Sequence, residues 1–147
     1  MADALKIGVA GLGTVGVSVV QLLEKHAGQI ERRTGRSLTV TAVSARNRTR
    51  DRGIDTSGFT WFDDPVAMAN AAELDIFVEL IGGEAVPSVQ SVLAVPRRGV
   101  HVGTANKALI LQRGFDLARV TAPIHACRTS DGARACGLPM KPMLNSG

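Results

Sequence analysis

Aromatic residues are scarce in this chain of 147 residues, which has no tyrosine, one tryptophan and four phenylalanines. Proteins that bind single-stranded nucleic acid commonly stack its bases on aromatic side chains. The 17 lysines and arginines exceed the 13 aspartates and glutamates, which gives a formal net charge of +4. With so few stacking residues, this positive charge favours a small anionic ligand over nucleic acid as the partner.

Cysteine is equally rare. The two cysteines, Cys127 and Cys136, both lie near the end of the sequence. They are too few for a disulfide framework or for a zinc site with four cysteine ligands. His125 is close to Cys127 in sequence, but three scattered candidates in a stretch without periodicity do not resemble a ligand set. We therefore expect no bound metal.

Long apolar runs are also missing. No stretch reaches the roughly 20 apolar residues that a membrane-spanning helix needs, and the first residues lead into a strand without the pattern of a secretory signal. The sequence therefore predicts a cytoplasmic protein without membrane contact. Its length corresponds to one domain of ordinary size, and a hydrophobic content of 45% is enough to build a core.

The most informative segment present is a strand, a glycine-rich turn and a helix at the start of the chain. The apolar run Leu5–Ala10 precedes the turn, and an amphipathic run to Ala27 follows it. In this setting the first glycine permits a tight turn, the second lets the backbone approach a diphosphate, and the third allows close packing of helix and strand. The segment predicts a dinucleotide site, with a purely structural turn as the alternative. The expected cofactor-binding residues are Gly11, Leu12, Gly13, Thr14, Val15 and Gly16.

The spacing of apolar residues predicts which face of the first helix is buried. Val15, Val19, Leu22 and Leu23 fall on one side of a helix, so we expect this side to face the core. The polar stretch that follows, residues 28–37, is expected to be a solvated loop.

Strand and helix patterns alternate along the remaining sequence. Predicted strands cover residues 38–43, 75–81 and 100–102, and predicted helices cover residues 65–69, 87–95, 106–111 and 115–120. Asp64 followed by Pro65 is typical of a helix start. This alternation predicts an α/β fold, a Rossmann-type doubly wound parallel sheet. Ligands bind such sheets at the carboxyl ends of the strands, which here points to loops 11–16, 44–52, 81–85 and 103–107.

The loop after the second predicted strand indicates which dinucleotide is bound. A carboxylate at this place usually contacts the ribose 2′-hydroxyl of NAD, whereas arginine accommodates the 2′-phosphate of NADP. Here Arg46 and Arg48 follow the strand, and no acidic residue occurs before Asp51. We therefore expect NADP(H) to be favoured over NAD(H), with Arg46 and Arg48 at the phosphate and with Arg50 and Arg52 solvated.

Several motifs together resemble the nucleotide-binding domain of homoserine dehydrogenase. They are Val9–Gly16, Ser44–Arg48, Val78–Glu84 and the most specific of them, Thr104–Leu109. The resemblance implies NAD(P)H-dependent interconversion of L-aspartate 4-semialdehyde and L-homoserine, on the route to threonine and methionine. It also implies that Lys107 lies near the nicotinamide and the amino-acid-derived substrate, and that Ile81 and Thr104 line the cofactor pocket. Glu79 and Glu84 are not assigned as an acid or base.

The sequence departs from the family pattern after residue 84 and again after residue 120. We therefore expect an NAD(P)-binding domain over residues 1–120, and an irregular, unrelated segment over residues 121–147. On this interpretation the chain is a truncated homoserine dehydrogenase without its substrate and dimerisation domain. No matching segment supplies the family's proton-donor lysine, and the sheet is incomplete at its carboxyl-terminal end. An exposed sheet edge would favour a homo-oligomer. The alternative function is a non-catalytic NADP(H)-binding module.

Overall fold

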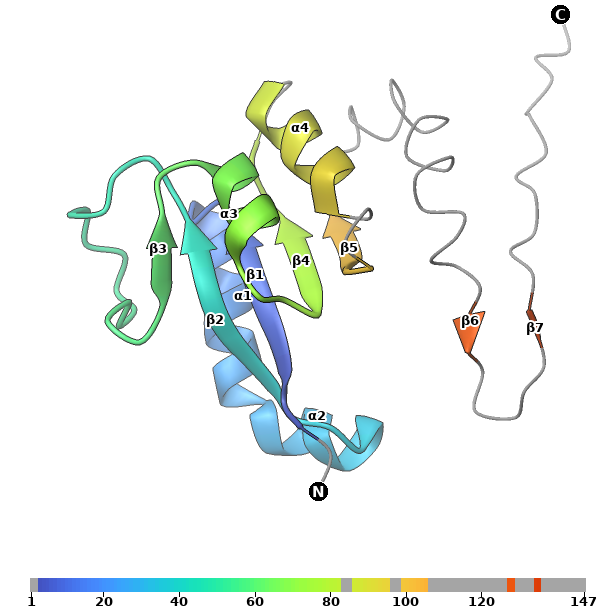
Figure 1. Ribbon diagram of the computed structural model, residues 1–147. Helices are drawn as coiled ribbons and strands as arrows, with labels where there is room; N and C mark the ends of the chain where they lie inside the picture. The colour runs from blue at the N-terminus through green and yellow to red at the C-terminus, as the bar shows by residue number, and fades with distance from the viewer. Residues whose placement is uncertain (1–2, 83–85, 96–98, 106–126, 129–133, 136–147) are drawn as a thin grey trace, which may run out of the picture.

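A computed structural model of the chain describes residues 3–82, 86–95, 99–105, 127–128 and 134–135. Five strands form one sheet in the order β3-β2-β1-β4-β5, and every neighbouring pair is parallel. The order reverses at β1, whose neighbours are β2 on one side and β4 on the other (Figure 1). The strands are β1 (Leu5–Ala10), β2 (Leu38–Ser44), β3 (Thr60–Phe62), β4 (Ile76–Glu79) and β5 (His101–Thr104).

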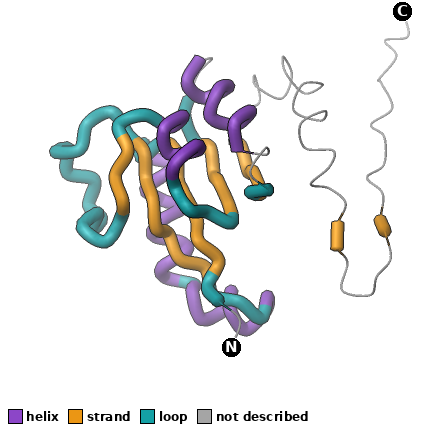
Figure 2. The backbone as a smooth tube through the Cα atoms, in the orientation of Figure 1, coloured by secondary structure: helices purple, strands orange, loops and turns teal. Residues whose placement is uncertain are grey.

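Helices cover both faces of this sheet. One face carries α1 (Thr14–Lys25), and the other carries α3 (Pro65–Ala71) and α4 (Val86–Ala94), which pack together (Figures 1 and 2). The short helix α2 (Ala27–Thr34) lies near the amino ends of the strands (Figure 1). The predicted α/β fold with a doubly wound parallel sheet is therefore confirmed.

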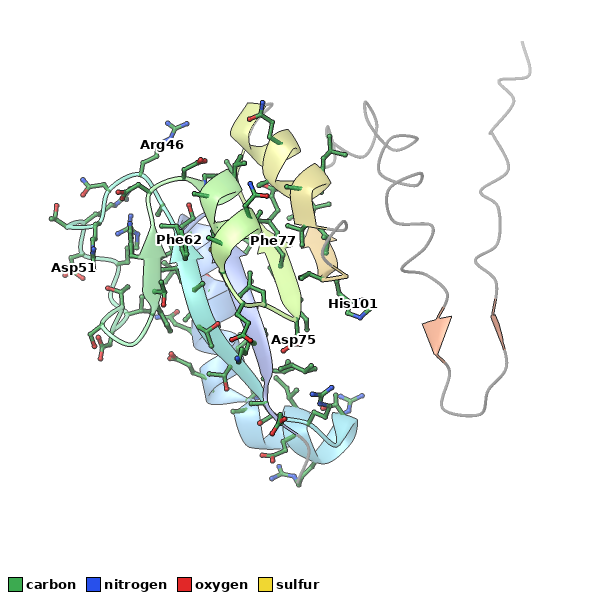
Figure 3. All side chains as sticks on the ribbon, in the orientation of Figure 1. Arg46, Asp51, Phe62, Asp75, Phe77 and His101 are labelled. Carbon is green, nitrogen blue, oxygen red and sulfur yellow. The ribbon has the colours of Figure 1, made fainter. Side chains whose placement is uncertain are left out.

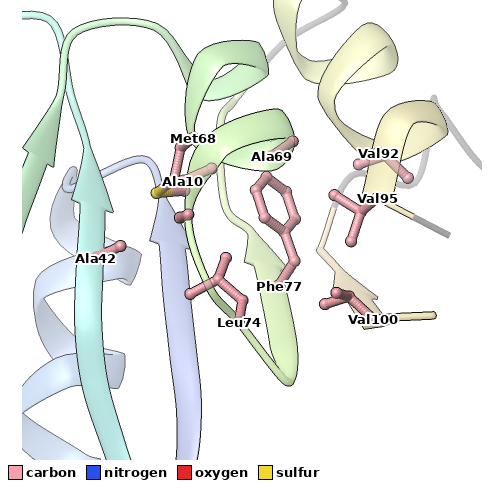
Figure 4. Packing of buried hydrophobic residues seen from close by; sticks show 10 residues of the cluster. Ala10, Ala42, Met68, Ala69, Leu74, Phe77, Val92, Val95 and Val100 are labelled. Atoms are coloured by element: carbon pink, nitrogen blue, oxygen red, sulfur yellow. The ribbon is translucent and has the colours of Figure 1, made fainter. Parts of the chain in front are cut away.

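The two faces of the sheet build two hydrophobic cores. Phe77 packs toward α3 and α4 together with Met68, Val92 and Val95 (Figure 4). On the other face, Val20 of α1 packs in a cluster with the strand residues Ile7, Val9 and Val43. Alternation along β1 and β2 explains this division, because successive side chains of a strand point to opposite faces. A strand buried on both faces reads as a continuous apolar run, which is why β1 was predictable.

The buried face of α1 agrees only in part with the predicted one, since Leu23 is half-buried against the core. Val15 and Leu22 are 56% and 57% exposed, whereas Gly16 and Val20 are buried. The reason is the close contact between Gly16 and the carbonyl of Gly11, which turns that side of the helix toward the sheet. Apolar spacing alone did not distinguish this side from its neighbour.

The polar stretch predicted as a loop also contains a helix. Residues 27–34 form α2, which ends at Gly35 in the left-handed conformation, with φ of 75°. The amide of Gly35 donates to the carbonyl oxygen of Glu31 at 2.8 Å, a common way to end a helix. α2 has no buried residue, so it lacks the apolar periodicity by which a helix is recognised. The three-residue strand β3 was not predicted either.

Local signals at α3 predicted its start correctly. The side chain of Asp64 accepts hydrogen bonds from the amides of Val66 and Ala67, at 3.0 and 3.3 Å, and Pro65 occupies the first helical turn. We expect Asp64→Ala to lower the free energy of unfolding by about 1 kcal/mol, because these amides lose their acceptor. Urea denaturation measures this change. Asp64→Asn serves as the control, since asparagine caps equally well; an equal loss in both variants would contradict the capping role.

Less of the carboxyl-terminal part is described. Cys127–Arg128 (β6) and Arg134–Ala135 (β7) form a short antiparallel pair. The helices predicted over residues 106–120 lie outside the described residues. The predicted domain boundary at residue 120 therefore stays a prediction.

Candidate functional site at the carboxyl ends of the strands

The glycine-rich turn connects β1 to α1 at the point where the strand order reverses. Gly11 has φ of +99°, a conformation that side chains other than glycine rarely adopt. A Cβ at this position would lie 2.9 Å from the carbonyl carbon and oxygen of Leu80. The amide of Gly11 donates to the carbonyl oxygen of Ser44 at 2.8 Å. The turn is thereby held against the ends of both β2 and β4.

The other two glycines of the turn have different surroundings. A Cβ at Gly16 would lie 1.9 Å from the carbonyl oxygen of Gly11, so this position must remain bare for α1 to approach the turn. A Cβ at Gly13 would meet nothing within 4 Å. Gly13 is the N-cap of α1, and α1 has neither a side-chain cap nor an acidic residue in its first turn. The helix therefore begins with backbone amides and a positive dipole end that can accommodate an anion.

Leu12, Thr14 and Val15 complete the turn in three different environments. Leu12 is buried and belongs to the core beneath α1. Thr14 and Val15 are exposed in the first turn of α1. Thr14 uses its backbone carbonyl oxygen to accept from the hydroxyl of Ser18 at 2.8 Å. Leu12 therefore anchors the turn in the core, whereas Thr14 and Val15 lie on its solvent-exposed side.

The arginine-rich loop follows β2 at the same end of the sheet. Arg46 and Arg48 are exposed, and Arg46 lies two residues after the last residue of β2. Figure 3 shows Arg46 near the carboxyl ends of the strands, whereas Asp75 and His101 lie at the opposite end. Because Ser44 is bonded to the glycine-rich turn, Arg46 and this turn belong to the same edge of the sheet.

Arg52 is not the solvated residue that the sequence predicts. Its Nε donates to the carbonyl oxygen of Leu12 at 3.1 Å, and Nη1 donates to the carbonyl oxygen of Arg50 at 2.9 Å. Its guanidinium also lies over the ring of Trp61, 5.3 Å from the centroid, a cation–π arrangement. Arg52 therefore ties the arginine-rich loop to the glycine-rich turn. No local sequence pattern predicts this contact, because its two residues are 40 positions apart.

The ends of β4 and β5 are joined through Glu79. This residue is fully buried, and its Oε1 accepts from the amide of Ile81 at 2.7 Å. Its Oε2 accepts from the hydroxyl of Thr104, the last residue of β5. Ile81 and Thr104 are both half-buried. The structure thus brings together the ends of β4 and β5, as the loop positions predict. Glu84 and Lys107 lie outside the described residues.

An exposed ion pair lies at the amino ends of the strands, opposite the candidate site. Lys6 Nζ and Glu73 Oε2 are 2.8 Å apart on the surface. Their hydrogen bond raises the pKa of Lys6 and lowers the pKa of Glu73. Such exposed pairs contribute little to stability. This pair lies far from the carboxyl ends and takes no part in the site.

The ranges that the structure describes contain neither a metal-binding cluster nor a membrane-spanning helix. In these ranges no three histidine, cysteine, aspartate or glutamate residues are placed to hold a metal ion; His125 and Cys136 lie outside them. None of the described helices is long and apolar enough to cross a membrane.

Known proteins match this chain in sequence and in structure. Residues 11–123 match the family model described as the NAD binding domain of homoserine dehydrogenase. The homoserine dehydrogenase of Pseudomonas aeruginosa is 35% identical over 143 residues, which cover 97% of this chain and 32% of that protein. Both alignments extend beyond residue 120, into the segment that is expected from the sequence to be unrelated.

Solved structures give the same result. A crystal structure of Staphylococcus aureus homoserine dehydrogenase matches with a TM-score of 0.74 and 28% identity, over 84% of this chain and 31% of that one. The enzyme from Thiobacillus denitrificans matches with a TM-score of 0.74 and 31% identity, over 83% and 28%. The chain thus spans about a third of the length of its relatives, within their NAD-binding part. The glycine-rich turn, the parallel sheet and these matches together show that the chain belongs to the homoserine dehydrogenase family.

Proposed function

We propose that this chain binds a nicotinamide dinucleotide across the carboxyl ends of its sheet, as the cofactor-binding part of a homoserine dehydrogenase. The reaction is the NAD(P)H-dependent interconversion of L-aspartate 4-semialdehyde and L-homoserine, which we place in the cytoplasm. The cofactor supplies or accepts the hydride. This chain's own residues bind and orient it, with the diphosphate over Gly11–Gly16 and the adenosine toward the end of β2.

The observation that carries this proposal is the bare backbone of the glycine-rich turn. Gly13 offers open space where an anion approaches the first amides of α1, and Gly11 and Gly16 hold the turn in that shape. Backbone N–H groups at a helix start are a well-suited site for a diphosphate. We assign the nicotinamide end to the loops after β4 and β5, with Ile81, Thr104 and Lys107 as its lining residues.

The packing of aromatic residues supports a small ligand over nucleic acid. Trp61 lies under Arg52, Phe77 is fully buried, and Phe59 and Phe62 are half-buried against the two cores. Among the described residues, therefore, no aromatic ring stands free for base stacking beside the arginine-rich loop.

Arg46 is the residue we assign to cofactor preference. Arg46→Ala is expected to weaken NADPH binding at least tenfold, about 1.4 kcal/mol, and NADH binding less than twofold, because only NADPH carries the 2′-phosphate that arginine contacts. The single tryptophan, Trp61, serves as the reporter, since reduced nicotinamide absorbs its emission. Titration of the unaltered chain by the same readout tests the proposed function itself.

The matched control for Arg46 is Arg33→Ala. Arg33 is exposed in the last turn of α2, near the amino ends of the strands (Figure 1). Its removal changes the net charge as much as Arg46→Ala does, but far from the proposed cofactor site. Equal weakening of NADPH and NADH by Arg46→Ala would contradict the assignment. So would an Arg33→Ala variant that weakens NADPH as strongly.

A further inference from the structure

Glu79 is a buried acidic residue whose role the proposed function leaves open. It is fully buried at the end of β4, and it is the one ionisable residue among the buried side chains of the described ranges. Placing a carboxylate in a protein interior costs several kcal/mol unless hydrogen bonds compensate for the lost water. A residue of this kind at the ligand edge of the sheet therefore needs an explanation.

The hydrogen-bond partners of Glu79 lie at or just after the ends of β4 and β5. Its side chain accepts from the Ile81 amide and from the Thr104 hydroxyl. Its backbone carbonyl oxygen also accepts from the amide of Ala105 at 3.1 Å. Glu79 thus connects the loop after β4 with the loop after β5, on the side of the sheet away from Arg46.

These hydrogen bonds determine the direction of the Thr104 hydroxyl. A carboxylate has only acceptor oxygens, so the hydroxyl must donate its proton to it. Toward any other group, Thr104 can then act only as an acceptor. Half-buried at the end of β5, it presents an acceptor where the proposed function places the nicotinamide.

We propose that Glu79 is a positioning residue that orients the Thr104 hydroxyl to accept a hydrogen bond from the carboxamide N–H₂ of the nicotinamide. This inference rests on the proposed function. It also implies that Glu79 and Thr104 select against a ligand with a carboxylate in place of the carboxamide. Such a ligand would meet a hydrogen-bond acceptor and a nearby negative charge.

The test compares NADP⁺ with nicotinic acid adenine dinucleotide phosphate, which carries that carboxylate and is otherwise identical. We expect the unaltered chain to bind NADP⁺ at least tenfold more tightly than the acid analogue, the ratio that one hydrogen bond to a charged group is worth, about 1.4 kcal/mol or more. In Glu79→Gln, the amide can still accept from Ile81 but donates to Thr104, which frees the hydroxyl proton for the ligand. The preference is then expected to fall below about threefold.

Thr104 provides a second pair of variants that does not alter the buried carboxylate. Thr104→Val removes the acceptor but leaves the Glu79 charge, so it is expected to reduce the preference by less than Glu79→Gln does, and Thr104→Ser, which retains the hydroxyl, is expected to keep it. Circular dichroism and thermal unfolding check that each variant is folded. A merely structural role for Glu79 would lower stability without changing the ratio of the two affinities.

The possible results separate the two claims. A folded Glu79→Gln variant with an unchanged preference would overturn the inference; if that variant does not fold, an unchanged preference in Thr104→Val would do so. An unaltered chain that binds both dinucleotides equally would also overturn it, while leaving the proposed function in place. A chain that binds neither dinucleotide would remove the proposed function, and the inference with it.

Discussion

Gly16→Ala is expected to destabilise the fold more than any other single change considered for this site. The added Cβ would lie 1.9 Å from the carbonyl oxygen of Gly11 and 2.9 Å from its carbonyl carbon. Both are backbone atoms, so no side chain can rotate away, and either α1 or the turn must move. We expect a loss of about 3 kcal/mol or more, measured by urea denaturation. A variant within about 1 kcal/mol of the unaltered chain would contradict the close packing of α1 on the turn.

Gly13→Ala is expected to have the opposite profile, with normal stability and impaired binding. Its Cβ would meet nothing within 4 Å, and its φ of −77° suits alanine. The methyl group would instead occupy the space where the backbone approaches the diphosphate. We expect NADPH affinity to fall at least tenfold, about 1.4 kcal/mol, since hydrogen bonds from the turn to a charged group would lengthen.

Calorimetric titration with NADPH measures the effect of Gly13→Ala. Gly58→Ala is the matched control, because a Cβ at Gly58 also meets nothing within 4 Å and Gly58 is exposed outside the glycine-rich turn. Gly58→Ala should leave both stability and affinity unchanged. Unchanged NADPH affinity in Gly13→Ala would contradict the placement of the diphosphate.

Features that depend on neighbours in sequence were predictable. β1 reads as an apolar run because both of its faces are covered, and Asp64 with Pro65 marks the start of α3. The glycine spacing likewise predicts the turn between β1 and α1, because Gly11 needs a positive φ and Gly16 must stay bare beside Gly11. The parallel sheet then follows from the alternation of these elements.

Features that depend on distant contacts were not predictable. Val20 of α1 packs in one cluster with Val43 of β2, and from the sequence alone several apolar faces of α1 would satisfy the helical period equally well. In the sequence, Arg52 is indistinguishable from the other arginines of a basic loop. Its contacts with Leu12 and Trp61 form only in the folded chain. Glu79 similarly finds Thr104 across 25 residues of sequence.

We propose that the amides of the glycine-rich turn bind the diphosphate of a nicotinamide dinucleotide. Isothermal titration calorimetry of the folded chain with NADPH, and with NADH as competitor, tests it most directly. We expect saturable binding of NADPH at one site, tighter than that of NADH. Folded protein that takes up neither dinucleotide would contradict it.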